Sequence, residues 1–138
     1  MPKTNTCPFS QNINPQAPVS FVAADAQTVK TVFTAGAEDS VIKAILITST
    51  ASAAQDIQFY ISPDGIANFE LRRVSIPANS GNSGTVSPFD ALTTSALPLD
   101  ENANRVLRLR RGFQLRANCP TALSGSEKIN IIVLGEDF

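Results

Sequence analysis

Few of the side chains that perform acid–base or nucleophilic chemistry occur in this chain of 138 residues. The sequence contains no His, two Cys and twelve acidic residues. Because His is the general base of Ser-His-Asp and Cys-His catalysis, neither arrangement can be built from these residues. A glycosidase needs two carboxylates that face each other across a cleft, and the spacing of the acidic residues places no pair in that way. We therefore expect no catalytic residue and no enzymatic activity.

Sites for metals, nucleotides or other cofactors are not indicated either. The absence of His excludes His-containing zinc sites, and two Cys are too few for a zinc site made of Cys alone. The oxygen-rich segment at residues 100–104 lacks the spacing of an EF-hand calcium loop, and a polar turn explains it better. The chain has no phosphate-binding glycine motif. We expect no metal, no cofactor and no small-molecule substrate.

The arginines are unevenly distributed along the chain. All seven lie between residues 72 and 116, although the net charge is only −1. On a strand, Arg108, Arg110 and Arg116 would project from one face as a basic strip. Such a strip suits an acidic protein surface, because the planar guanidinium pairs with carboxylates through two hydrogen bonds. A solvated outer sheet face explains the same pattern equally well, whereas nucleic-acid binding would want a basic excess and exposed aromatic residues.

Residues 1–18 have the composition of an arm outside the globular domain. Four prolines interrupt any strand or helix there, and no hydrophobic period is present. The segment also lacks the apolar stretch of a secretory signal, so we do not expect secretion. A disordered tail and an extended arm that orders on a neighbouring subunit are both consistent with this composition. Phe9 and Ile13 are the apolar side chains that favour the arm and would make its contacts.

Short stretches of alternating apolar and polar residues predict β-strands from residue 19 onward. We expect them at residues 19–23, 28–34, 41–50, 55–62, 69–76, 105–109, 113–117 and 129–134. The stretch 41–50 is apolar on both faces and is placed in the centre of a sheet. In 55–62 the expected inward side chains are Ile57, Phe59 and Ile61, and the expected outward ones are Gln58, Tyr60 and Ser62.

Turn residues join these strands into two expected hairpins. Pro63-Asp64-Gly65 carries the turn chemistry that folds residues 69–76 back onto residues 55–62. A change in the apolar phase of the returning strand predicts a bulge near Arg72-Arg73. Arg111-Gly112 predicts a second hairpin, which would pair residues 105–109 with residues 113–117.

The predicted strands form one all-β domain at residues 19–138. Seven or eight strands without a convincing amphipathic helix fit an antiparallel β-sandwich or jelly roll, preceded by the extended N-terminal arm. The longest apolar runs are far shorter than the roughly 20 residues of a membrane-spanning helix. Cys7 and Cys119 are each followed by proline, and a disulfide between them is left open because Cys pairs in non-secreted chains are usually free thiols.

The second half of the chain resembles small β-sandwich virion proteins of tailed bacteriophages, which include head decoration (cement) proteins. The resemblance extends over roughly residues 28–138. It is carried by LPLDEN at residues 97–102, RVLRL at 105–109, GFQLRA at 112–117 and the closing IIVLGEDF at 131–138.

This resemblance implies a non-enzymatic structural role on the capsid surface of a virion, after synthesis in the host cytoplasm. It implies the major capsid protein as partner, and homo-oligomers, often trimers, whose arm or loops grip the shell. No nucleic acid, membrane or catalytic residue is implied. A tail, baseplate or fibre-associated module of the same particle is the alternative. A carbohydrate-binding β-sandwich is less supported, because the chain has no Trp and one Tyr to form aromatic platforms.

Overall fold

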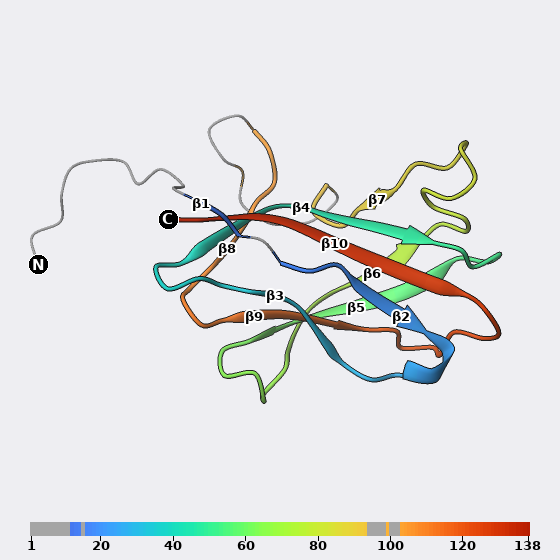
Figure 1. The fold of residues 1–138 in the computed structure, drawn as a ribbon, viewed down its shortest axis with the longest axis horizontal. Coiled ribbons are helices and arrows are strands. Elements are labelled where there is room, and N and C mark those ends of the chain that lie inside the picture. Colours follow the sequence, from blue (N-terminus) through green and yellow to red (C-terminus); the bar gives the residue numbers. More distant parts are fainter. Residues whose placement is uncertain (1–11, 15, 94–98, 100–102) are drawn as a thin grey trace, which may run out of the picture.

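The computed structural model describes residues 12–14, 16–93, 99 and 103–138. Within these residues, two antiparallel sheets pack face to face, so the predicted all-β sandwich is confirmed. In Figure 1 the long strands β4 (Ser40–Ser49) and β10 (Lys128–Asp137) lie side by side, and the strands of the second sheet lie below them.

The first sheet has six strands and is built around β4 and β10. β10 pairs with β4 on one side and with both β1 and β2 on the other, and β4 also pairs with β7 and β8. The four additional strands are β1 (Asn12–Asn14), β2 (Val19–Val22), β7 (Phe89–Asp90) and β8 (Leu107–Leu109). The central position predicted for residues 41–50 is therefore confirmed.

The second sheet has four strands in the order β3-β9-β5-β6. Its strands are β3 (Lys30–Thr34), β5 (Gln55–Ser62), β6 (Phe69–Ile76) and β9 (Gln114–Asn118). The core between the two sheets is aromatic and β-branched, as the strand pattern requires. Its largest fully buried side chains include Phe21, Phe33, Phe59, Ile47 and Ile131.

The turn at Pro63-Asp64-Gly65 forms the predicted hairpin between β5 and β6. The Asp64 carboxylate accepts hydrogen bonds from the backbone N–H groups of Ile66 (2.8 Å) and Ala67 (2.9 Å), and Gly65 adopts a φ of 78°. The register shifts where Phe59 faces Arg72 and Tyr60 faces Glu70, which leaves Leu71 as the extra residue. The predicted bulge is therefore present one residue before Arg72.

Two side chains of β5 differ from their expected exposure. Ser62 is buried. Its hydroxyl accepts a hydrogen bond from the Gly65 N–H (2.8 Å), which supports the turn. Gln58 is also buried, and its amide donates to the Phe59 carbonyl (3.2 Å). An outward position does not expose a polar group when a local hydrogen bond and neighbouring chain cover it.

The second predicted hairpin is wrong. β8 pairs with β4 in the six-stranded sheet, whereas β9 pairs with β3 and β5 in the four-stranded sheet. The chain changes sheets at Gly112, whose φ is 75°. Alternation identifies the inward side chains of each strand but does not identify the neighbouring strand, so the turn at Gly112 was assigned to the wrong pairing.

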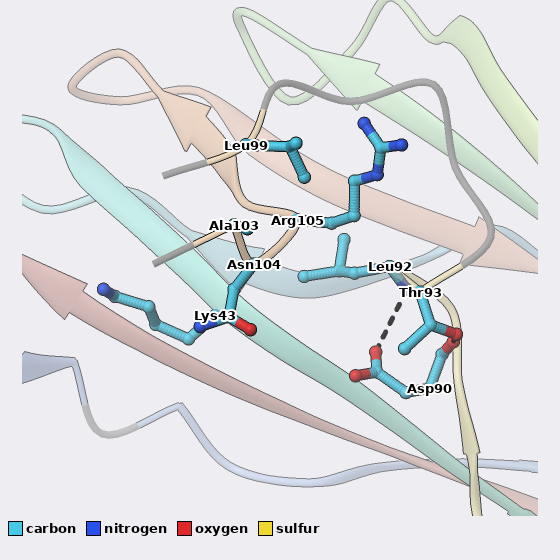
Figure 2. Close-up of a pocket in the computed structure, with 8 residues that line it drawn as sticks. All are labelled: Lys43, Asp90, Leu92, Thr93, Leu99, Ala103, Asn104 and Arg105. Carbon is cyan, nitrogen blue, oxygen red and sulfur yellow. Dashed lines mark hydrogen bonds between the residues drawn. The ribbon is translucent and has the colours of Figure 1, made fainter. Parts of the chain in front are cut away.

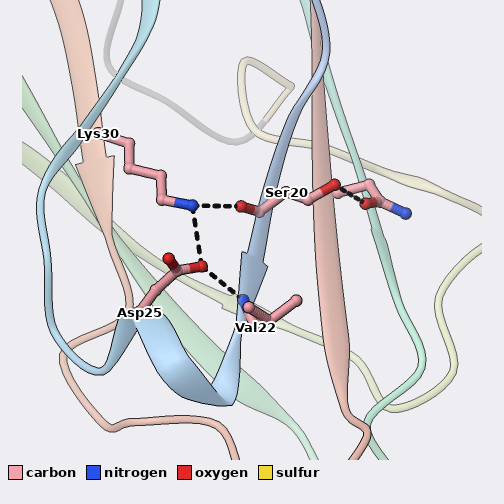
Figure 3. Close-up of polar contacts among 5 residues, drawn as sticks. Ser20, Val22, Asp25 and Lys30 are labelled. Carbon is pink, nitrogen blue, oxygen red and sulfur yellow. Dashed lines mark hydrogen bonds and ion pairs between the residues drawn. The ribbon is translucent and has the colours of Figure 1, made fainter.

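An ion pair stabilises the connection between β2 of one sheet and β3 of the other. Lys30 Nζ donates to Asp25 Oδ2 (2.8 Å) and to the Ser20 carbonyl (2.7 Å), and the same Asp25 oxygen accepts the Val22 N–H (2.8 Å) (Figure 3). The Lys30 ammonium also lies 5.2 Å from the centroid of the Phe21 ring. These contacts fix the short 3-10 helix at Ala23–Asp25, where the chain crosses between the sheets.

The described part of the predicted arm is built into the six-stranded sheet. Asn12–Asn14 pairs with the last residues of β10. The buried Asn14 donates through Nδ2 to Asp137 Oδ1 (2.8 Å) and to the Thr34 carbonyl (3.2 Å), so it joins both sheets. Residues 1–11, which include Phe9, lie outside the described residues.

Candidate docking surface

Two of the predicted contact residues, Ile13 and Arg108, lie on the same face of the six-stranded sheet. It is the outer face, which is directed away from the other sheet. The strand registers place Ile13 opposite Glu136, Glu136 opposite Val41, and Val41 opposite Arg108. Directly opposed residues of antiparallel strands project from the same face. Ile13 and Arg108 therefore share one cross-strand row and are separated by three strand spacings, roughly 14 Å.

Beside this row the outer face is apolar. Leu134 is opposite Ala44 and Ile132 is opposite Leu46. Leu134 is 50% exposed, and Ile13 is 80% exposed. Large aliphatic side chains that lie together in water at this exposure are typical of a surface that binds another protein.

The next row is polar and forms a boundary of the apolar area. Asn130 lies opposite Thr48 on one side and Ser20 on the other, and the Ser20 hydroxyl donates to the Asn130 side-chain oxygen (2.6 Å). The apolar rows therefore lie between this polar row and the row that contains Glu136 and Arg108. An apolar centre with a polar and charged border is the usual composition of a protein–protein contact.

A β-bulge between β4 and β10 places Lys43 on this surface. The register shifts between Leu134 and Gly135, which leaves Lys43 as the extra residue on β4. Gly135 is required here, because a Cβ at this position would lie 2.6 Å from Cε2 of Phe33 in the core. The bulge brings an exposed ammonium group between the apolar rows and the charged row.

Lys43 also lines two shallow hollows of the sheet. The first, of about 440 Å³, lies along β1 and β10 and is mostly apolar; its lining includes Ile13, Ile132 and Leu134. The second, of about 560 Å³, lies beside β7 and β8 and includes Asp90, Leu92 and Arg105 (Figure 2). Surface relief of this kind gives a protein partner shape as well as apolar area.

Among the described residues that line the second hollow, the polar groups do not converge on one position as they would in a small-molecule site. The Asp90 carboxylate is engaged by the backbone N–H groups of Leu92 (3.0 Å) and Ile45 (3.2 Å). Figure 2 shows the side chains of Lys43 and Arg105 pointing in different directions. Ligand pockets instead direct a few polar groups at one position, which fixes the orientation of the ligand.

Arg108 is exposed, and its guanidinium carbon lies 5.6 Å from the centroid of the Phe138 ring. This cation–π contact holds the charge beside the apolar rows without using its hydrogen-bond donors. Arg110 is exposed beyond the end of β8. The backbone N–H of the next residue, Arg111, donates to Asp39 Oδ1 (2.7 Å).

Arg116 belongs to a different part of the molecule. It lies on β9 in the four-stranded sheet, where its guanidinium donates to the Gly65 carbonyl (3.2 Å) and to Asn68 Oδ1 (3.0 Å). Arg116 thus holds the β5–β6 turn. The basic strip expected from Arg108, Arg110 and Arg116 on one strand face does not form, because β8 and β9 are in different sheets.

Sequence reasoning missed the apolar residues of this surface. Residues 129–134 are predicted as a strand, and the exposed side chains Ile132 and Leu134 of that strand point outward. A signal was present, because one side of the strand must face away from the core, and the run Ile131–Leu134 is apolar on both sides. It also missed Ile66 and Phe69, at the β5–β6 turn of the other sheet, which are 82% and 62% exposed.

Cys119 is buried and forms no disulfide with a described residue, and burial raises the pKa of its thiol to about 11. The thiolate, which is the nucleophile and metal ligand, is therefore disfavoured. Cys7 lies outside the described residues, so the disulfide stays open. Within the described ranges, no group of three or more His, Cys, Asp or Glu side chains is placed to hold a metal ion.

Comparison with known proteins gives no relative: no family model, curated protein or solved structure matches the chain. In the part of the chain that the structure describes, no helix has the length and apolar character needed to cross a membrane.

Proposed function

We propose that this chain is a non-enzymatic structural protein of a phage virion, which binds the capsid surface and stabilises it. The observation that carries the proposal is the outer face of the six-stranded sheet. Exposed Ile13, Ile132 and Leu134 lie there beside Lys43 and Arg108. This composition suits contact with a protein shell, which the sequence resemblance also favours.

The chemistry of the face fits a protein partner with acidic groups near an apolar area. Burial of Ile13 and Leu134 against the shell would contribute the hydrophobic term. Arg108 can pair bidentately with a carboxylate of the shell, because its contact with Phe138 leaves its hydrogen-bond donors available. The partner we propose is the major capsid protein.

Many weak contacts would make this binding strong. A homo-oligomer that docks several copies of the same face on a symmetric shell gains avidity without any new type of contact. The N-terminal arm would add a further contact through Phe9. An arm that orders on docking loses conformational entropy, so its apolar side chain matters most for affinity.

The experiment that tests this function is the copy number of the protein in purified particles, measured by quantitative mass spectrometry against the major capsid protein. We expect a number comparable to that of the shell protein. A few copies per particle would move the protein to the tail, baseplate or fibre. Its absence from particles would overturn the virion assignment.

A further inference from the structure

Among the described residues, the two edges of the four-stranded sheet differ in their hydrogen bonding. At the β3 edge, the Thr34 carbonyl accepts the Asn14 side chain (3.2 Å) and the Thr34 N–H donates to Gln16 Oε1 (3.3 Å). At the opposite edge, β6 forms its backbone ladder with β5, and its outer side makes no backbone hydrogen bond to any described residue. An open strand edge of this length is a template for pairing with another chain.

Exposed apolar side chains accompany this open edge. Phe69 and Leu71 are on β6, and Ile66 is in the turn that precedes it. Phe69 and Ile66 are more exposed than Leu134 on the opposite sheet. Natural proteins usually protect a free edge with charge, and here the edge combines charged residues with apolar ones.

The charges on β6 are complementary to those of a second, antiparallel β6. Glu70 and Arg73 lie on either side of the bulge at Leu71, and their partners on β5 are Tyr60 and Gln58. Because these partners are two residues apart, Glu70 and Arg73 project from the same face of the sheet. Both are exposed, and neither makes an ion pair or a hydrogen bond with another described side chain.

We propose that β6 pairs with β6 of a second copy of this chain, antiparallel and about a two-fold axis that passes through the bulge between Leu71 and Arg72. This register sets Glu70 of each copy opposite Arg73 of the other, and it places Leu71 of each copy beside Arg72 of the other, next to the axis. Two four-stranded sheets become one continuous sheet. The interface is isologous, since the same patch serves both copies.

This pairing does not depend on the proposed function, because it uses the sheet opposite the docking surface. One copy can therefore bind a shell and a neighbour at the same time. A two-fold contact also differs from the three-fold arrangement that the sequence resemblance implies. A single strand edge is smaller than a standard protein interface, so we expect a dimer whose population rises with protein concentration.

The test is sedimentation velocity of the full chain and of charge-reversal variants up to high protein concentration. The wild type should dimerise. Glu70→Arg and Arg73→Glu should each raise the dissociation constant by about tenfold or more, because both charge pairs become repulsive. Glu70→Arg/Arg73→Glu should restore the dimer. An equimolar mixture of the two single variants should form a heterodimer, since each supplies the charge that the other lacks.

Glu38→Arg and Arg110→Glu are matched controls, because they make the same charge changes at exposed positions outside β6. They should dimerise as the wild type does. Cross-linking provides a second measurement that is independent of charge: Leu71→Cys in a Cys7→Ser background should form a disulfide between copies, and Leu134→Cys in the same background should not. A wild type that stays monomeric or forms trimers overturns the proposal. So does a double variant or a mixture that fails to dimerise.

Discussion

Ile13 and Arg108 are 95 residues apart in the sequence and lie in one cross-strand row, linked through Glu136 and Val41. The row exists because β1 and β8 flank the two long strands β10 and β4. A surface made in this way has contributions from the N-terminal segment, the centre and the C-terminus. We therefore expect substitutions of its side chains, rather than deletion of a single loop, to disrupt this surface.

Leu134→Asp should weaken binding to capsid particles without unfolding the protein. Leu134 is half exposed, so a carboxylate there stays in water in the free protein but would be buried against the shell. Cosedimentation with particles that lack this protein measures the effect. Ile66→Asp is the control, because it makes the same kind of change at an exposed position in the β5–β6 turn of the other sheet. Equal binding by both variants would remove the outer face from the docking surface.

An N-terminal truncation should lower the stability of the protein only if it removes β1. Removal of residues 1–11 leaves β1 in place, whereas removal of residues 1–18 deletes it together with Asn14. Asn14→Ala alone should lower the free energy of unfolding by about 1–3 kcal/mol, because it removes the Asn14 hydrogen bonds to the Thr34 carbonyl and to the Asp137 carboxylate, which then keeps the Ser40 hydroxyl as donor. Urea unfolding measures all three variants.

The shorter truncation also isolates the contribution of Phe9. We expect it to weaken particle binding while its unfolding curve matches that of the full chain. The same loss of binding in Phe9→Ala would assign the effect to this side chain. If the truncated protein binds as tightly as the full chain, residues 1–11 do not contact the shell.

Gly135→Ala should destabilise the sandwich by about 1–3 kcal/mol through overpacking. The added methyl group would lie 2.6 Å from Cε2 of Phe33 and 3.2 Å from the Val41 carbonyl oxygen. Phe33→Leu in the same chain should relieve part of this cost, so the two substitutions should be non-additive in chemical denaturation. Strict additivity would mean that the strand shifts away from Phe33 and that the close approach is not enforced.

The sequence predicts local structure well in this chain and predicts pairing between distant strands poorly. The bounds of β5 and β6 agree with the expected ones, because Pro63, Asp64 and Gly65 specify their turn chemically. The error at Gly112 arose because a glycine turn looks the same whether the chain returns to its neighbour or crosses to the other sheet. That choice depends on contacts with β4 and β5, which no local pattern contains.

The candidate surface was predictable only in part, for the same physical reason. Ile13 and Arg108 were both identified from the sequence, but their proximity depends on the register of four strands. Arg116 was grouped with Arg108 by spacing alone, and the sheet crossing separates the two. Leu134 is exposed because the other face of β10 packs on the core. Alternation could not show this, because both faces are apolar.

Asp25 should make the stability of the protein depend on pH in acid. The hydrogen bond from Lys30 and that from the Val22 N–H lower the pKa of Asp25 below its usual 3.8. A lowered folded-state pKa stabilises the protein above the unfolded-state value, and this contribution is lost as the pH falls through the folded-state pKa. The stability difference between wild type and Asp25→Asn should therefore be largest near neutral pH and decline below about pH 4.

Lys30→Met provides the comparison for this effect, because it removes the main cause of the shift. In the Lys30→Met background, Asp25→Asn should have a smaller and flatter effect on the midpoint of thermal unfolding between neutral and acid pH. A difference between wild type and Asp25→Asn that stays constant over the whole range would show that Asp25 does not titrate differently in the folded chain.

Cys119 should resist alkylation in the native protein and react once the chain unfolds. It is 1% exposed, and burial raises its pKa to about 11, so at mildly alkaline pH both access and the thiolate fraction are low. Iodoacetamide labelling with and without urea, read by peptide mapping, assigns the label to each cysteine. Labelling is repeated after treatment with a reductant, because a disulfide to Cys7 would also block the reaction. Reductant-dependent labelling in urea would identify that disulfide, and rapid labelling of Cys119 in the native protein would contradict its buried position.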